Sequence, residues 1–348
     1  MAVMMTAVPK LLCNTKGMTR GRWLKCREHG PDGDIEYTLG GSDVSIVFGE
    51  NPWTSPLALY QMKKGILKPD LSENADRKKM GQLMEPVVAY WYGAKAGVQV
   101  IEDTGLYQHA DYPYALANLD YRVLSDDGQG ILDCKTTNWR NAEKWADGAI
   151  PHYYELQVRY YMAVMDLEYA DLACMWGFDA EKEMAIRRVH RDRDIEAIIF
   201  EKLDEFINRL RTDSPPTMAA VDPGLAMKDL ARIYGASQSG QPTIEFGKKH
   251  EKALRRIALL QEDKSSLEQR IREYDKEVTA LSVKIAEMMG VHEHGLLETV
   301  SDKLVVDYVT RLTRRVDSDL LKKDHPHVYN AVLKTSSSRK VKVAVQAI

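Results

Sequence analysis

Asp133 and Lys135 stand two residues apart in an apolar run, residues 130–137, that reads as a strand. Successive side chains of a strand point to opposite faces, so these two share one face. A carboxylate beside an ammonium group suits phosphodiester hydrolysis, because hard Mg²⁺ binds carboxylate oxygens, polarises phosphoryl oxygens and generates hydroxide. A neighbouring lysine can orient the attacking water. The same pair on an exposed hairpin would form only a surface salt bridge.

A second carboxylate is expected on the same face. An Asp-Gly pair at 127–128 precedes the run and predicts a two-residue hairpin turn. A turn at that pair places Asp120 opposite Lys135, and Arg122 opposite Asp133. Two carboxylates and a lysine would then meet on one face of the hairpin.

Glu85 is a third candidate ligand. It lies in a helix predicted over residues 74–94, whose apolar stripe consists of Met84, Val88 and Trp91. Pro86 follows it directly and would start or kink the helix, which puts Glu85 near a helix end. A solvated helix glutamate is the alternative.

Polar residues on two other predicted helices could contact a phosphate. In the segment 40–43, Ser42 or Asp43 is predicted to cap a short helix whose backbone N–H groups could receive a phosphate, although most such caps only start helices. Gln157 lies on a helix predicted over residues 151–165. It could hold a phosphate or the catalytic lysine, or be an ordinary satisfied polar group.

The elements that would position these residues alternate between helices and strands, which predicts an α/β core with a central mixed sheet flanked by helices. Ser214-Pro215-Pro216 ends the last helix of this core, so we expect the core to span residues 1–217. The expected strands cover 98–101, 115–124, 130–137, a segment around Leu172 and 185–189, and the main helices 74–94, 151–165 and 192–211.

The chain beyond the core predicts a linker (218–245), a coiled-coil or long-helix arm (246–290) and a small basic module (291–348) with a strand near 304–310. The arm is predicted because apolar side chains recur every seven residues. They are Ile257, Ile271, Val278 and Ile285 at one position (with Lys264 between the first two), and Leu260, Leu267, Tyr274, Leu281 and Met288 at the other.

The composition, with 44% hydrophobic and 28% charged residues, is typical of a soluble folded protein. Four scattered cysteines and the absence of any long apolar run favour a cytoplasmic protein with no zinc site, disulfide framework or membrane segment. The net charge is −3, but residues 302–348 carry ten Lys/Arg and five Asp/Glu, a local +5. A tail that contacts DNA and a merely solvated tail both fit this charge.

Five segments in chain order carry a more specific signal: Gly-Gly-Ser-Asp (40–43), Gly-Glu-Asn-Pro-Trp-Thr-Ser-Pro (49–56), Gly-Gln-Leu-Met-Glu-Pro (81–86), Ile-Leu-Asp-Cys-Lys-Thr (131–136) and Gln-Val-Arg-Tyr (157–160). Together they resemble the motifs of YqaJ-like viral recombinases and lambda-type exonucleases, in the PD-(D/E)xK nuclease superfamily. Two positions depart from the family pattern. Leu119 stands where a proline is expected, and Asp133 where glutamate is commoner, which leaves the metal geometry open.

The resemblance implies a PD-(D/E)xK, restriction-endonuclease-like core and a role for each matching residue. The implied catalytic residues are Glu85, Asp120 and Asp133 as metal ligands, Lys135 beside the attacking water, and Gln157 as support for the site. The implied substrate-binding residues, near a 5′-phosphate pocket, are Trp23, Arg27 and Ser42.

The resemblance further implies a Mg²⁺-dependent exonuclease, with Mn²⁺ as a substitute, that digests duplex DNA ends in the 5′→3′ direction. It would leave 3′ single strands for a single-strand annealing recombinase in phage-type homologous recombination. A homo-oligomer, with a ring trimer as one form, in the cytoplasm of a bacterial host of a phage or prophage is also implied. The alternatives are an endonuclease or junction resolvase of the same superfamily, and a non-catalytic DNA-binding scaffold, which the intact acidic residues and lysine disfavour.

Overall fold

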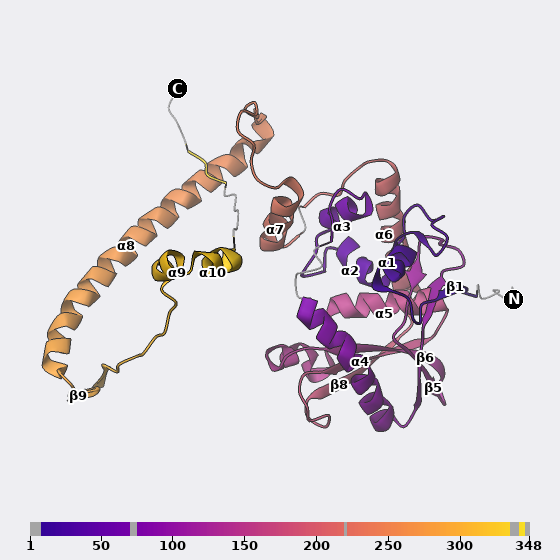
Figure 1. Cartoon of the computed structure of the whole chain (residues 1–348), viewed down its shortest axis with the longest axis horizontal. Coiled ribbons are helices and arrows are strands. Elements are labelled where there is room, and N and C mark those ends of the chain that lie inside the picture. The colour runs from indigo at the N-terminus through magenta and orange to yellow at the C-terminus, as the bar shows by residue number, and fades with distance from the viewer. Residues whose placement is uncertain (1–7, 70–74, 219–220, 335–340, 345–348) are drawn as a thin grey trace. The chain divides into compact units, whose positions relative to one another are not determined.

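The computed structural model describes residues 8–69, 75–218, 221–334 and 341–344. The chain divides into two compact units, Met1–Gly235 and Ala236–Ile348 (Figure 1). The first unit therefore extends beyond the expected boundary at residue 217. The reason is α7 (Pro223–Tyr234), which forms within the predicted linker and contacts α3 (Pro56–Lys63).

A five-stranded mixed sheet with the order β2-β5-β6-β7-β8 forms the centre of the first unit. Only β6 and β7 pair in parallel, and the other neighbours are antiparallel. A parallel pair needs a long crossover connection, and α5 provides its helix. These elements are β2 (Gln99–Glu102), β5 (Tyr121–Ser125), β6 (Gly128–Thr136), β7 (Tyr169–Met175), β8 (Met184–His190) and α5 (His152–Met165).

Helices cover both faces of this sheet (Figure 1). On one face α4 (Ala75–Ala96) packs against a cluster that includes Leu132. On the other face α5 and α6 (Arg193–Arg211) bury a larger cluster that includes Ile131. The expected α/β class with a central mixed sheet between helices is confirmed. Because side chains alternate along β6, Asp133 lies on the α5 face, as Ile131 does.

A second, three-stranded antiparallel sheet has the order β1-β3-β4 and was not predicted. Its strands are β1 (Lys10–Asn14), β3 (Gly105–Gln108) and β4 (Leu116–Ala117). The single strand predicted over 115–124 is therefore wrong, because the chain leaves this small sheet after β4 and enters the central sheet at β5. Between β1 and α4 the chain forms three short helices, α1 (Arg20–His29), α2 (Gly41–Val47) and α3, of which α2 is the short helix expected after residues 40–43.

Helix α4 corrects two expectations. Pro86 lies inside the helix, so Glu85 is near the middle of α4 and not at an end. Trp91 is 38% exposed and Tyr92 is buried in its place, because Tyr92 follows Val88 at the four-residue spacing of one helical face. The expected first residue of the helix, Asn74, lies outside the described residues.

The second unit contains one long helix, α8 (Glu251–Met289), which is 39 residues long. Its heptad side chains from Leu260 to Met288 are largely exposed, so the coiled coil stays a prediction. The unit continues with the hairpin β9 (His294–Glu298) and β10 (Lys303–Asp307), which contains the expected strand, and with α9 (Ser318–Asp324) and α10 (Pro326–Val332). No helix among the described residues is long and apolar enough to cross a lipid bilayer.

Candidate functional site

The hairpin register differs from the predicted one by two residues. A turn at 127–128 of the I′ type would need positive φ at both residues, and of the two only Gly128 has one (97°). The turn therefore lies at 126–127, and Gly128 opens β6 opposite Ser125. Arg122 consequently pairs with Ile131 and not with Asp133, and its side chain forms an ion pair with Asp103 at 2.5 Å.

The two-residue shift keeps every side chain on its expected face. Extending the observed register by one residue places Asp120 opposite Asp133, where the prediction had Lys135. An Asp120 carboxylate oxygen accepts a hydrogen bond from the backbone N–H of Cys134 at 3.0 Å, which fixes the residue beside β6. The two carboxylates therefore lie together on one face of this hairpin, as predicted, but Asp120 and Asp133 face each other and not Lys135 and Arg122.

Lys135 and Asp133 form a buried ion pair on the strand face where the sequence places them. Asp133 is only 2% exposed, and the Lys135 ammonium also lies 4.9 Å from the centre of the Tyr154 ring on α5. Burial alone would lower the pKa of Lys135, but the negative charges of Asp133 and Asp120 outweigh it and raise that pKa. The lysine is therefore a fixed cation.

The carboxylates of this cluster carry more negative charge than Lys135 can offset. Burial raises the pKa of Asp120 well above its usual value, and the neighbouring Asp133 adds to the increase. Burial also raises the pKa of Glu85, with Lys135 lowering and Asp133 raising it. With all three carboxylates ionised, one ammonium would leave an excess of two negative charges, which is why these pKa values are raised and which a divalent cation would balance.

The donor set fits a hard divalent ion. The Oδ2 atom of Asp133 is buried, and its polar contact among the described residues is the Lys135 ammonium. Carboxylate oxygens are the ligands that Mg²⁺ and Mn²⁺ prefer. In the described part of the chain, however, no three acidic, histidine or cysteine residues are already gathered into a metal-binding group. Binding would therefore have to draw Glu85 and the two aspartates closer together.

Gln157 supports this cluster from α5. Its amide nitrogen donates to Oδ1 of Asp133 at 3.5 Å and to the hydroxyl of Tyr161 at 3.1 Å. Tyr161 was not among the predicted site residues, although it lies four residues after Gln157, and residues four apart on a helix are neighbours. Burial raises the pKa of Tyr161 to about 12, so its hydroxyl stays neutral.

Trp23 and Arg27 lie one helical turn apart on α1, and the Arg27 guanidinium stacks 4.7 Å from the centre of the indole ring. The indole N–H donates to Asn118 at 3.1 Å, in the loop that leads to Asp120. Among the described residues the guanidinium of Arg27 has no carboxylate partner and no hydrogen bond. A stacked arginine of this kind can accept an anion in two hydrogen bonds.

Ser42 is exposed in the first turn of α2, and the structure corrects its expected role as helix cap. Gly40 is the capping residue, and its N–H donates to Asp43 at 3.0 Å. A side chain at Gly40 would begin only 2.8 Å from an Arg27 nitrogen, so Arg27 reaches the same end of α2 as Ser42. These three predicted substrate-binding residues, Trp23, Arg27 and Ser42, therefore share one region.

Gly41 joins this region to the carboxylate cluster. A Cβ atom at Gly41 would lie 2.5 Å from the Tyr161 ring, closer than real contacts allow. Glycine is thus what lets α2 lie directly against the tyrosine that holds Gln157 beside Asp133. The eight predicted site residues are accordingly brought to one side of the first unit, in two connected groups.

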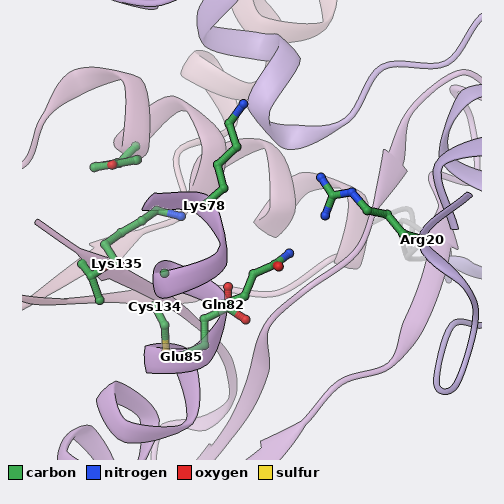
Figure 2. A pocket seen from close by; sticks show the side chains of 9 residues that line it. Arg20, Lys78, Gln82, Glu85, Cys134 and Lys135 are labelled. Carbon is green, nitrogen blue, oxygen red and sulfur yellow. The ribbon is translucent and has the colours of Figure 1, made fainter. Parts of the chain in front are cut away.

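A pocket of about 360 Å³ opens beside Glu85 and Lys135. Its wall is formed by α4 together with the end of β6, and α1 contributes Arg20 from across the pocket (Figure 2). The remaining lining residues are Lys78, Gly81, Gln82, Cys134, Thr136 and Tyr154. The pocket thus gives the solvent access to two of the predicted catalytic side chains.

Comparison with known proteins finds similarity in the segment that carries this site. Residues 22–168 match the family model described as the YqaJ-like viral recombinase domain. The protein YqaJ of Bacillus subtilis (strain 168), described as uncharacterized, is 26% identical over 334 residues, which cover 95% of this chain and 96% of that protein.

Two solved structures are also similar. One is an alkaline exonuclease (LHK-Exo) from Laribacter hongkongensis, with 21% identity, a TM-score of 0.43, and coverage of 51% of this chain and 89% of that one. The other is a phage related exonuclease from Haemophilus somnus 129PT, with 14% identity, a TM-score of 0.36, and coverage of 51% and 96%. The match of residues 22–168 to this family model agrees with the resemblance that the motifs of the chain carry.

Proposed function

We propose that the chain is a metal-dependent DNA exonuclease with a PD-(D/E)xK core. The observation that carries the proposal is the buried cluster in which Asp120, Asp133 and Lys135 meet on one hairpin, with Oδ2 of Asp133 buried against the Lys135 ammonium. Glu85 adds a third carboxylate from α4. The family name and the exonuclease relatives are consistent with this chemistry.

Glu85, Asp120 and Asp133 are the residues that would hold Mg²⁺, with Mn²⁺ as a substitute. The bound ion would polarise the scissile phosphate and supply hydroxide near neutral pH. The raised pKa of Lys135 favours its charged form, which suits it to orient the attacking water and offset phosphate charge. Gln157 keeps the Asp133 carboxylate oriented through its amide.

We further propose 5′→3′ digestion of duplex ends, with Trp23, Arg27 and Ser42 at the terminal phosphate. Arg27 supports this direction, because its guanidinium is free to take an anion close to the cluster. The product would be a 3′ single strand for an annealing recombinase, in the cytoplasm of a phage-infected or lysogenic bacterium. A homo-oligomer, such as a ring trimer, would keep the enzyme on its strand.

The test is digestion of end-labelled linear duplex beside a closed circle, with Mg²⁺, with Mn²⁺ and with EDTA. An exonuclease degrades only the linear form and needs the metal. Cleavage of the circle would identify an endonuclease or junction resolvase, and DNA binding without any cleavage would identify a scaffold.

Asp133→Asn and Lys135→Ala should each reduce the digestion rate by about a hundredfold or more while DNA binding persists, because both act on the reacting phosphate. Lys95→Ala is the matched control, since Lys95 lies on the same unit and its ion pair in the described part of the chain is with the exposed Glu181 at 3.5 Å. Wild-type rates in either site variant would remove that residue from the catalytic site.

A further inference from the structure

Two cations at the rim of the catalytic pocket have no partner among the described residues. Arg20 reaches in from α1 and Lys78 lies on α4 across from it (Figure 2). Neither side chain forms an ion pair or hydrogen bond with any described residue, and both are exposed. Lys135, deeper in the pocket, is already paired with Asp133. The pocket thus offers two uncommitted positive charges on opposite walls.

In a second pocket, by contrast, the arginines are paired with carboxylates. It has about 380 Å³ and is lined by Arg159, Arg188 and Arg191, so it is richer in arginine than the catalytic pocket. Each of these arginines is committed to a carboxylate: Arg159 to Glu155 at 2.7 Å, Arg188 to Asp171 at 2.8 Å and Arg191 to Asp166 at 2.5 Å. These ion pairs leave the arginines of the second pocket with little net attraction for an anion. Arg20 and Lys78, which are unpaired among the described residues, can still attract one.

The position of Lys78 on α4 separates it from the carboxylates. Lys78, Gln82 and Glu85 follow the spacing of one helix face and all line the pocket. Seven residues at ~1.5 Å per residue put Lys78 about 10 Å from Glu85 along the helix axis, and both side chains lean toward the N-terminus, so the lean does not close that separation. A phosphate held by Lys78 is therefore not the one that undergoes hydrolysis beside Glu85.

We propose that Arg20 and Lys78 form a phosphate clamp that takes two non-scissile phosphates of the nucleic acid strand entering the catalytic pocket. Calling these phosphates non-scissile rests on the proposed nuclease function. Binding of the phosphates by Arg20 and Lys78 does not require cleavage. Arg20 suits a bidentate contact with phosphate oxygens, and Lys78 supplies a flexible point charge. Both contacts are to the backbone, so they favour a strand of any sequence.

Fluorescence anisotropy with a labelled, 5′-phosphorylated DNA duplex tests the clamp in EDTA, where the full chain does not cut. Each phosphate contact contributes about 0.7 to 0.9 to the slope of log affinity against log salt concentration. Arg20→Gln and Lys78→Gln should each lower the slope by about that amount and weaken binding several-fold on all sequences. Arg22→Gln and Lys79→Gln are the matched controls, because each removes the same charge from the same helix outside the pocket lining.

Neutral methylphosphonates placed singly along the strand locate the two phosphates. At the phosphate that a residue contacts, the losses of binding free energy caused by the amino-acid substitution and by the methylphosphonate should be non-additive. At every other position the two losses should be additive. We expect one such position for Lys78 and a different one for Arg20, neither of them at the cleaved bond.

Salt slopes that fall equally in the control variants, or additivity at every methylphosphonate position, would overturn the clamp. These outcomes are separate from the fate of the nuclease proposal. A wild-type chain that binds duplex but never cuts it with Mg²⁺ would end that proposal, while the slopes and methylphosphonates would still decide whether Arg20 and Lys78 hold phosphates.

Discussion

At the scale of single residues, Arg27 is the clearest predicted contact to a DNA end. Its guanidinium stacks on Trp23 and has no carboxylate partner among the described residues. If it grips a terminal phosphate, Arg27→Ala should abolish any preference for 5′-phosphorylated over 5′-hydroxyl ends, because only the former offers the bidentate contact. Initial digestion rates on the two substrates give the ratio. Arg22→Ala on the same helix is the control, and an unchanged ratio in Arg27→Ala would exclude Arg27 from the pocket.

Substitution of Gly41 by alanine, which adds one methyl group, tests whether the packing of α2 against Tyr161 supports the site. Alanine there would place its Cβ 2.5 Å from the buried ring of Tyr161, so the ring must move and Gln157 must lose its place beside Asp133. Losing such support typically costs about tenfold or more in metal affinity or activity. Gly41→Ala should therefore weaken Mn²⁺ binding, measured by titration calorimetry, and slow digestion. Gly21→Ala, which meets nothing within 4 Å, should do neither. Equal Mn²⁺ affinities for the two variants would contradict the role assigned to Gly41.

Single residues were also the level at which the sequence was most informative. The alternation of β6 was enough to place Asp133 and Lys135 on one face, because strand geometry allows no other arrangement. The contact between Gly41 and Tyr161 could not be predicted in the same way. It joins two helices that are 120 residues apart in the chain, and no local spacing encodes it.

At the scale of elements, the hairpin shows how a register can be wrong while the site survives. The Asp-Gly pair suggested a turn at 127–128, but the positive φ of Gly128 opens the returning strand instead. The shift is two residues, an even number, so the faces are kept and Asp120 still joins the cluster. The Asp-Gly pair alone could locate the turn only to within one or two residues. The exact register of the strand also depends on its pairing with β7, which is a tertiary contact.

Helix α4 carries Lys78, Gln82 and Glu85, and one hydrogen bond ties it to the sheet. The Tyr92 hydroxyl donates at 2.6 Å to Asp171 on β7, a carboxylate that is 2% exposed and also paired with Arg188. Tyr92→Phe removes this donor from a buried carboxylate, so we expect the free energy of unfolding to fall by about 1–3 kcal/mol. Urea denaturation measures the change. Tyr90→Phe, on the exposed side of α4, is the control, and a loss no larger than in that variant would show that the bond contributes nothing.

At the scale of the whole molecule, the extent of the first unit depends on a contact that sequence patterns do not reveal. The proline pair at 215–216 marked a plausible boundary, yet α7 follows it and its buried Asp229 accepts a hydrogen bond at 2.8 Å from the backbone N–H of Ser55. The two residues are 174 positions apart. The end of a helix is visible in the sequence, but whether the next helix packs on the same core is decided by such distant partners.

The separation into two units gives the last prediction. The unit that ends at Gly235 contains every proposed catalytic residue, so a fragment of residues 1–235 should fold and retain metal-dependent hydrolysis. A fragment that ends at residue 217 should be less stable, because losing Asp229 leaves the buried N–H of Ser55 without its acceptor. Thermal unfolding of the two fragments, side by side, checks this difference.

The same fragment tests whether the second unit contacts DNA. Residues 302–348 carry a net charge of +5, although Arg339 and Lys340 of this tail lie outside the described residues. If these cations meet phosphates, the fragment 1–235 should bind duplex more weakly than the full chain and with a smaller salt slope. A full-length variant with Arg311, Arg314 and Arg315 changed to glutamine separates charge from assembly, because it keeps α8 and its heptad face. A reduced slope in both proteins, at an unchanged sedimentation coefficient for the variant, supports a DNA role. Equal slopes in the fragment, the variant and the wild type would instead leave the second unit with a role in subunit or partner contacts through α8.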